Sequence, residues 1–131
     1  MRRLHHVQIS IPAGGESDAR SFYATTVGLA EIPKPEHLRS RGGLWFRLDS
    51  GLELHLGSDI GFRPSAKAHV AIEVDDLGAL RGRLEAAGVR VWEDQPLPGF
   101  DRFYAADPFG NRLEFLARPR GERTTAGTDP R

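Results

Sequence analysis

The feature that most constrains the fold is an internal repeat. Two stretches, residues 4–57 and 68–117, show the same order of predicted elements: a strand, a helix and then three strands. A four-stranded sheet with one helix leaves a face uncovered, whereas two copies can form a curved mixed sheet around a cleft, with helices outside. The repeat therefore predicts an α+β fold of two βαβββ modules, forming a single domain over residues 1–118.

The first half begins with a strand. Apolar and polar side chains alternate over residues 4–11, which is typical of a half-buried strand. Ser17 or Asp18 is expected to cap a helix that ends at Gly28, because glycine commonly terminates helices. The remaining predicted strands of this half are 29–32, 44–48 and 52–56.

The second half restarts after a predicted linker at 58–67. A strand is expected over 69–74, followed by a helix that is capped by Asp75 or Asp76 and closed by Gly88. The remaining predicted strands of this half are 89–92, 102–106 and 112–117.

Composition limits the chemistry of any site. The chain has 18 basic and 18 acidic residues, which argues against a phosphate backbone or an anionic membrane as partner. Cysteine is absent, so a metal ion must be held by His, Asp or Glu. The N-terminus contains no long apolar run, so we expect a cytoplasmic protein. Residues 119–131 lack apolar periodicity and are predicted to form a flexible tail.

The repeat places ligand-type residues at equivalent positions. His6 and His69 begin the first strand of each half, on the face opposite the Val and Ile residues, while His55 and Glu114 each lie between apolar residues near the end of a half. Pseudo-twofold symmetry would bring three imidazoles and one carboxylate together, a plausible ligand set for Zn, Ni, Mn or Fe. Alignment on the turn glycines selects His55 as the partner of Glu114, but alignment on the Leu-Glu pairs selects Glu53.

Two pairs of residues could line the predicted cleft. Trp45 and Arg47 share one strand face, as do Arg102 and Tyr104. Each pair could provide an aromatic wall and an anion clamp for a substrate, or could be ordinary surface. The pair of Arg102 and Tyr104 is the preferred candidate.

Three segments carry a resemblance to a known family. They are Leu4-His5-His6-Val7, Ala68-His69-Val70 and, most specifically, Asp107-Pro108-Phe109-Gly110-Asn111-Arg112-Leu113-Glu114. Together with the paired modules they resemble the vicinal oxygen chelate superfamily, which includes glyoxalase I, fosfomycin-resistance thiol transferases, dioxygenases and metal-free bleomycin-binding proteins. The resemblance implies that His6, His69 and Glu114 are metal ligands and that Tyr104 faces the substrate.

The resemblance also implies a function. We expect a metal-dependent enzyme of the lyase or isomerase type, in which a divalent ion chelates neighbouring oxygens of a small molecule during isomerisation, thiol addition or epimerisation. Glu114 would bind the ion and transfer a proton. The alternative is a binding protein of the bleomycin-resistance type that sequesters an antibiotic.

Small two-module members of this superfamily usually dimerise. The resemblance therefore implies a homodimer with shared sites, each taking His6 and His55 from one subunit and His69 and Glu114 from the other. Such pairing would also cover strand edges that one chain leaves open.

Overall fold

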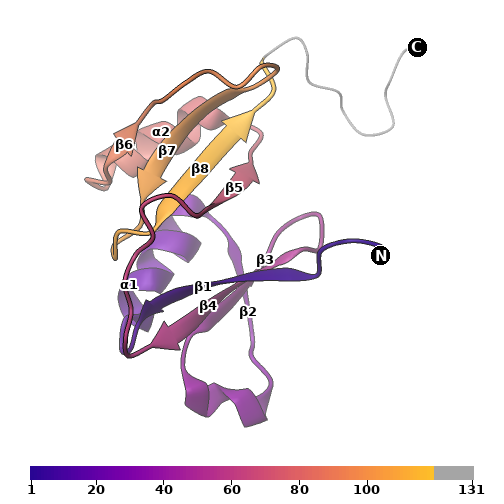
Figure 1. Cartoon of the computed structure of the whole chain (residues 1–131), viewed down its shortest axis with the longest axis vertical. Helices are drawn as coiled ribbons and strands as arrows, with labels where there is room; N and C mark the ends of the chain where they lie inside the picture. The colour runs from indigo at the N-terminus through magenta and orange to yellow at the C-terminus, as the bar shows by residue number, and fades with distance from the viewer. Residues whose placement is uncertain (120–131) are drawn as a thin grey trace.

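The computed structural model describes residues 1–119 and contains the two predicted βαβββ modules (Figure 1). Each module forms its own four-stranded mixed sheet, in the order β1-β4-β3-β2 for the first and β5-β8-β7-β6 for the second. The outer pairs β1–β4 and β5–β8 are parallel, and the neighbouring pairs are antiparallel. The strands are β1 (His6–Pro12), β2 (Ala30–Ile32), β3 (Leu44–Arg47), β4 (Glu53–Asp59), β5 (His69–Glu73), β6 (Val91–Trp92), β7 (Asp101–Ala106) and β8 (Arg112–Ala117).

The first helix differs from the prediction at its start. It begins as α1 (Glu16–Arg20), follows Gly15 without a side-chain cap, and continues as the π-helical segment η1 (Ser21–Val27). Ser17 and Asp18 therefore lie inside the first turn and do not cap it, because the turn that ends β1 already starts the helix at Glu16. The predicted end is confirmed: Gly28 adopts the left-handed conformation, with φ of 95°.

The second helix and the loops follow the sequence more closely. Helix α2 (Leu77–Ala86) is capped by Asp76, whose carboxylate accepts a hydrogen bond from the backbone N–H of Ala79 at 3.0 Å. Two differences concern the connections. The loop after β2 contains a short 3₁₀ helix, η2 (Glu36–Arg41), and β4 extends to Asp59, so the linker begins later than residue 58.

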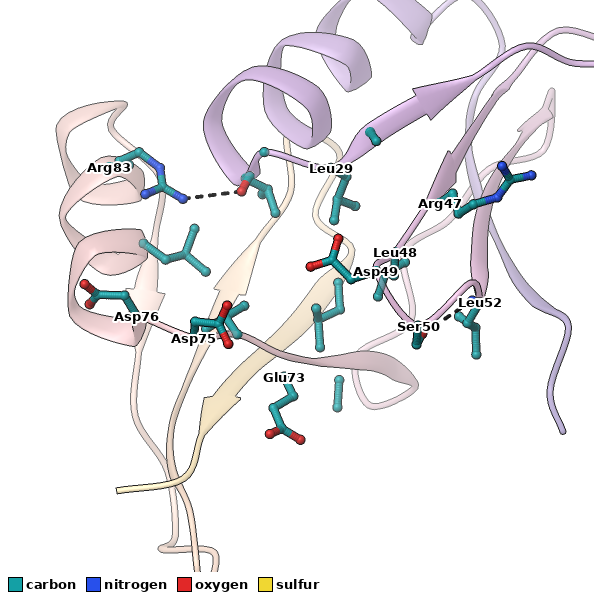
Figure 2. A pocket seen from close by; sticks show the side chains of 17 residues that line it. Leu29, Arg47, Leu48, Asp49, Ser50, Leu52, Glu73, Asp75, Asp76 and Arg83 are labelled. Carbon is teal, nitrogen blue, oxygen red and sulfur yellow. Dashed lines mark hydrogen bonds between the residues drawn. The ribbon is translucent and has the colours of Figure 1, made fainter. Parts of the chain in front are cut away.

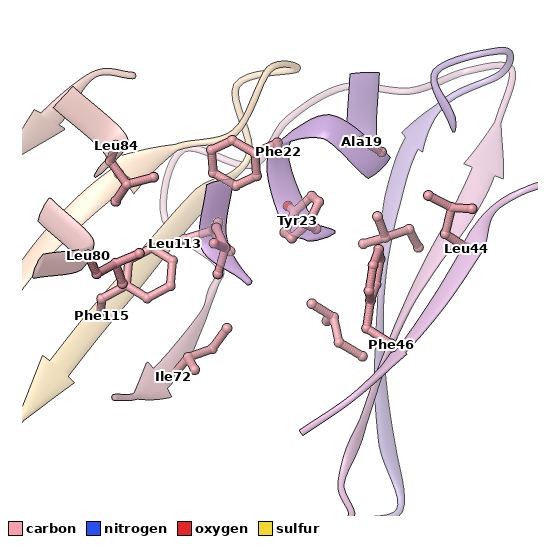
Figure 3. Packing of buried hydrophobic residues seen from close by; sticks show 14 of the residues in the cluster. Ala19, Phe22, Tyr23, Leu44, Phe46, Ile72, Leu80, Leu84, Leu113 and Phe115 are labelled. Carbon is pink, nitrogen blue, oxygen red and sulfur yellow. The ribbon is translucent and has the colours of Figure 1, made fainter. Parts of the chain in front are cut away.

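One apolar core joins the two modules. Phe22 and Tyr23 of η1 lie between the first sheet, represented by Phe46, and the second module, represented by Leu80 and Phe115 (Figure 3). All five side chains are buried. The core therefore occupies the helix-bearing face of each sheet, and the side chains that alternate with core residues lie on the opposite face.

A turn of the second module also hydrogen bonds to the first. The hydroxyl of Tyr23 donates to Asp107 Oδ2 at 2.7 Å, and Asn111 Nδ2 donates to the same oxygen and to the backbone carbonyl of Ser10. Asp107 Oδ1 accepts the backbone N–H groups of Phe109 and Asn111, which fixes the turn itself. The 107–114 segment thus has a structural role in holding the modules together.

The predicted tail at 119–131 lies almost entirely outside the residues that the structure describes. Among residues 1–119, no helix has the length and apolar character needed to cross a membrane.

Candidate metal and substrate site

The first sheet carries a stack of three rings on its polar face. His55 lies between Trp45 and His6, with centroid distances of 4.0 Å to the indole and 4.3 Å to the imidazole. Trp45 is the Cα partner of His55 in the β3–β4 pair, and His6 lies in the adjoining strand β1. The Nδ1 atom of His6 is 2.9 Å from Nδ1 of His5, which leaves Nε2 of His6 as its other donor atom.

Glu53 links the same ring stack to a guanidinium group. Its Oε1 is 2.9 Å from His55 Nε2, and its Oε2 accepts a hydrogen bond from Arg47 Nη2 at 3.2 Å. The contacts with His55 and then with Arg47 lower the pKa of the Glu53 carboxyl. Glu53 and His55 therefore both face this side of the sheet, and the carboxylate occupies the ring nitrogen that His55 would offer to a metal.

The second sheet carries a similar chain of contacts. His69 Nε2 is 2.9 Å from Glu114 Oε1, and Arg102 Nη1 donates to Glu114 Oε2 at 3.3 Å. His69 Nδ1 lies 2.8 Å from the carbonyl oxygen of Lys67. A carbonyl only accepts, so Nδ1 must carry the hydrogen. The lone pair of a neutral His69 then points at a carboxylate oxygen, and this contact requires a proton or a cation between the two atoms.

The strand registers settle which first-half residue is equivalent to Glu114. In the second sheet, His69 of β5 pairs with Arg112 of β8, and Glu114 lies two residues after Arg112. In the first sheet, His6 of β1 pairs with Glu53 of β4, and His55 lies two residues after Glu53. Alignment on the turn glycines is therefore the one that matches the strand pairing, and Glu53 is the register equivalent of Arg112.

The four predicted ligands form two pairs. His6 contacts His55 on the first sheet, and His69 contacts Glu114 on the second. Within residues 1–119, no group of three or more His, Asp or Glu side chains is arranged to hold a metal ion. Each module of one chain thus presents half of the predicted ligand set.

The predicted substrate residues lie beside these pairs. Trp45 and Arg47 adjoin His55 and Glu53, as described above. Tyr104 is the Cα partner of Glu114 and contacts the edge of His69, with centroids 5.6 Å apart, but it is only 4% exposed. Arg102 bonds Glu114 and the carbonyl of Gln95. Both residues therefore contact the predicted ligand pair, and their role in substrate binding stays a prediction.

Sequence reasoning missed three residues on the same face of the second module. Arg112 lies with its Cζ 4.0 Å from the ring centroid of Tyr104, Trp92 stacks beside Tyr104 at 5.8 Å, and Arg90 lies 4.4 Å over Trp92. The available signal was alternation: Arg112 is two residues before Glu114 and so shares its strand face.

A cavity between the modules lies elsewhere. It has a volume of about 570 Å³ and separates the β3–β4 turn from β5 and the start of α2 (Figure 2). Its polar lining includes Asp49, Glu73 and Arg83, and of the predicted site residues it contains Arg47. The cavity therefore lies between the modules of one chain and does not enclose either ligand pair.

Comparison with known proteins identifies the family. The profile of the Glyoxalase/Bleomycin resistance protein/Dioxygenase superfamily matches residues 3–115. The chain belongs to this superfamily. A comparison with curated proteins gave no match.

Solved structures agree with this assignment. A glyoxalase family protein from Bacillus anthracis is 42% identical, with a TM-score of 0.85 and 90% of this chain and 96% of that chain covered. The fosfomycin resistance protein FosX from Listeria monocytogenes is 18% identical, with a TM-score of 0.71 and coverage of 95% and 99%. TnmS3, an antibiotic binding protein from Streptomyces sp. CB03234, is 24% identical, with a TM-score of 0.68 and coverage of 90% and 98%. The last two share the fold.

Proposed function

We propose that this protein is a metal-dependent enzyme that acts on a small molecule with two neighbouring oxygen atoms. The observation that carries the proposal is the contact between His69 Nε2 and Glu114 Oε1 at 2.9 Å. Two ligands at about 2.1 Å from one ion are separated by about 3 Å at the right angles of an octahedral site and by about 3.4 Å in a tetrahedral site. The hydrogen bond from His69 Nδ1 to a backbone carbonyl is the usual support of a metal-binding imidazole.

The first-sheet pair takes the same role after two changes: His6 rotates, and Glu53 Oε1 releases His55 Nε2. The rings of His6 and His55 are nearly parallel, at 13°, so their in-plane lone pairs do not meet at one point. His6 is exposed and can rotate, whereas His55 is buried under Trp45. His6 and His55 would supply two imidazoles, and Glu53 is the alternative donor on the same face.

The ligands would meet in a homodimer. Each chain presents one imidazole pair and one imidazole–carboxylate pair, on the sheet faces that the helices leave open. Placing the first sheet of one chain against the second sheet of its partner would complete a four-ligand set of His6, His55, His69 and Glu114. This set of imidazole and carboxylate donors suits Zn, Ni, Mn or Fe.

The chain's own residues would then perform the proton chemistry. A divalent ion held there supplies Lewis acidity to the two substrate oxygens. Arg102 fixes Oε2 of Glu114, so Oε1 is directed toward His69 and the open face. Glu114 can then accept a proton from a neighbouring substrate atom and return it, as isomerisation or epimerisation requires; thiol addition would use the same polarised substrate.

A mixing experiment tests the shared site. One variant carries His6→Ala and His55→Ala, and the other carries His69→Ala and Glu114→Ala. Each variant alone should bind no Mn²⁺ beyond the background of a metal-free control protein. After the two are refolded together, the heterodimer has one intact site and one site that lacks all four ligands. We expect up to half of the wild-type Mn²⁺ per heterodimer, measured by elemental analysis.

The controls separate binding from folding. Circular dichroism must show that both variants fold, and native mass spectrometry must show that heterodimers form. Each variant refolded with itself provides the matched control. Heterodimers that bind no Mn²⁺ would overturn the shared site, and wild-type protein that binds no Mn²⁺, Zn²⁺, Ni²⁺ or Fe²⁺ would overturn metal dependence.

The second candidate is a protein that sequesters an aromatic small molecule without a metal. The stack of Trp45, His55 and His6 favours it, because a flat aromatic ligand can extend such a stack. Removal of metal with EDTA distinguishes the two functions. Sequestration is favoured if the protein binds its ligand equally well after EDTA treatment and shows no turnover when metal is present.

A further inference from the structure

Arginine and aromatic side chains alternate beside the His69–Glu114 pair. Arg90 lies over Trp92, Trp92 stacks beside Tyr104 with 25° between the ring planes, and Arg112 lies over Tyr104. We name these four residues the arginine–aromatic ladder. It extends from β8 across β7 to β6 on the polar face of the second sheet.

The charge of this region is positive. Arg90, Arg102 and Arg112 contribute three guanidinium groups, and Glu114 contributes the carboxylate that lies among them. Arg102 is already engaged with Glu114 and with the carbonyl of Gln95. The excess positive charge therefore resides on the ladder, where an anion would be attracted.

Arg112 has donors that the fold does not satisfy. Its Nε atom is buried and has no hydrogen-bond partner within residues 1–119. Its Nη1 atom makes a long contact of 3.5 Å with the carbonyl of Ala66. Buried donors without a partner are uncommon in native proteins and call for an explanation, such as a functional role. The aromatic ring below holds the guanidinium plane in place, so its N–H edges are already oriented.

We infer that the ladder binds a planar, conjugated organic carboxylate, and that this is the substrate class of the adjoining site. Arg112 binds the carboxylate through the edge formed by its two Nη atoms, a geometry that matches two carboxylate oxygens. Trp92 provides the apolar surface for the conjugated part. Arg112 Cζ lies 4.0 Å and the Trp92 ring lies 5.8 Å from the centroid of the Tyr104 ring, so the two groups are at most about 10 Å apart and one conjugated carboxylate that bridges across Tyr104 can contact both. The substrate assignment rests on the proposed function, but the anion subsite does not.

The test compares benzoate with benzamide, which have similar shapes and differ in charge. The full-length protein is titrated with each probe, and binding is followed by calorimetry and by tryptophan fluorescence. The chain has two tryptophans, so Trp92→Phe leaves Trp45 alone and shows which indole reports the ligand. We expect benzoate to bind at least 10-fold more tightly than benzamide, and the fluorescence change to be lost in Trp92→Phe.

Substitutions at Arg112 identify the carboxylate contact. Arg112→Gln should abolish the 10-fold preference and leave the affinity for benzamide unchanged, while Arg112→Lys should retain part of the preference. Arg81→Gln is the matched control, because Arg81 also lies over a ring of this sheet, at 5.6 Å from Phe103, but on the core face. It should bind both probes like the wild type. If circular dichroism shows that Arg112→Gln does not fold, the proposal is judged from the preference for benzoate over benzamide in Arg112→Lys and in the wild type.

Chelation separates this inference from the proposed function. The titrations are repeated on protein treated with EDTA. A preference for benzoate that persists without metal supports the ladder, even if no metal-dependent turnover is ever found. A preference that appears only with added Mn²⁺ would assign the carboxylate to the ion and overturn the ladder. Equal affinity for the two probes in the wild type, or an unchanged preference in Arg112→Gln, would also overturn it.

Discussion

The substitution Tyr23→Phe tests whether the turn at Asp107 joins the two modules. It removes the 2.7 Å hydrogen bond to Asp107 Oδ2 and keeps the ring, which packs at 4.8 Å from Phe22 and 5.9 Å from Phe46. A hydrogen bond to a charged group contributes about 1.5–3 kcal/mol. Asn111 still donates to the same oxygen, so we expect the lower part of that range, about 1.5–2 kcal/mol. In a domain of this size, Tm should fall by about 5–8 °C.

The pH dependence of this difference provides a second measurement. Burial, followed by the nearby Asp107 carboxylate, raises the pKa of Tyr23 well above its ordinary value of 10.0. Above pH 10 the Tyr23 phenol loses its proton in the unfolded chain but keeps it in the folded chain. The stabilisation by Tyr23 is therefore complete below pH 10 and declines as pH rises. The advantage of the wild type over Tyr23→Phe should therefore shrink by about 1.4 kcal/mol between pH 7 and pH 11.

Urea denaturation followed by circular dichroism at several pH values measures both effects. Tyr104→Phe is the matched control, because it removes the other phenol of the chain from outside the Asp107 network. Because its hydroxyl lies outside that network, Tyr104→Phe should lower the free energy of unfolding by less than Tyr23→Phe does. If Tyr23→Phe is as stable as the wild type, or if their difference does not depend on pH, the hydrogen bond between the modules does not stabilise the fold.

Substitutions at four further positions give separate expectations. Glu114→Gln should reduce Mn²⁺ affinity by at least about 10–100-fold with the fold retained, measured by elemental analysis and circular dichroism; an unfolded protein would mean that Glu114 is structural. Gly43→Ala should destabilise by more than about 3 kcal/mol in urea titrations, because the added Cβ would lie 2.1 Å from the backbone oxygen of Leu56 and φ is +84°. Gly88→Ala, with positive φ but open space, should cost about 1–2 kcal/mol, and equal losses at the two glycines would refute the steric argument. Asp76→Ala should cost about 1 kcal/mol by removing the cap of α2, with Asp76→Asn retaining most of the stability.

Local patterns in the sequence determined most of the fold. The alternation of polar and apolar residues fixes which face of a strand is buried, and so placed His6, His55, His69 and Glu114 on the faces opposite the core. The positions of Gly28 and of the α2 cap follow from backbone preferences that act within a few residues. The exception was the start of the first helix, where the turn after β1 overrode the expected caps and Gly15 precedes the first turn.

The repeated order of elements also determined that the two halves are equivalent, but it left the first-half partner of Glu114 open between His55 and Glu53, and the strand pairing chose His55. Tertiary structure alone decided what each side chain contacts. Tyr23 and Asp107 are 84 residues apart, and their hydrogen bond depends on how the modules pack. Glu53 and His55 could both be placed on one face from alternation, but only the folded sheet brings the carboxylate to the ring nitrogen. Likewise, the positions of Arg112 and Trp92 around Tyr104 depend on the pairing of three strands, β6, β7 and β8. Local sequence patterns do not predict which strands pair.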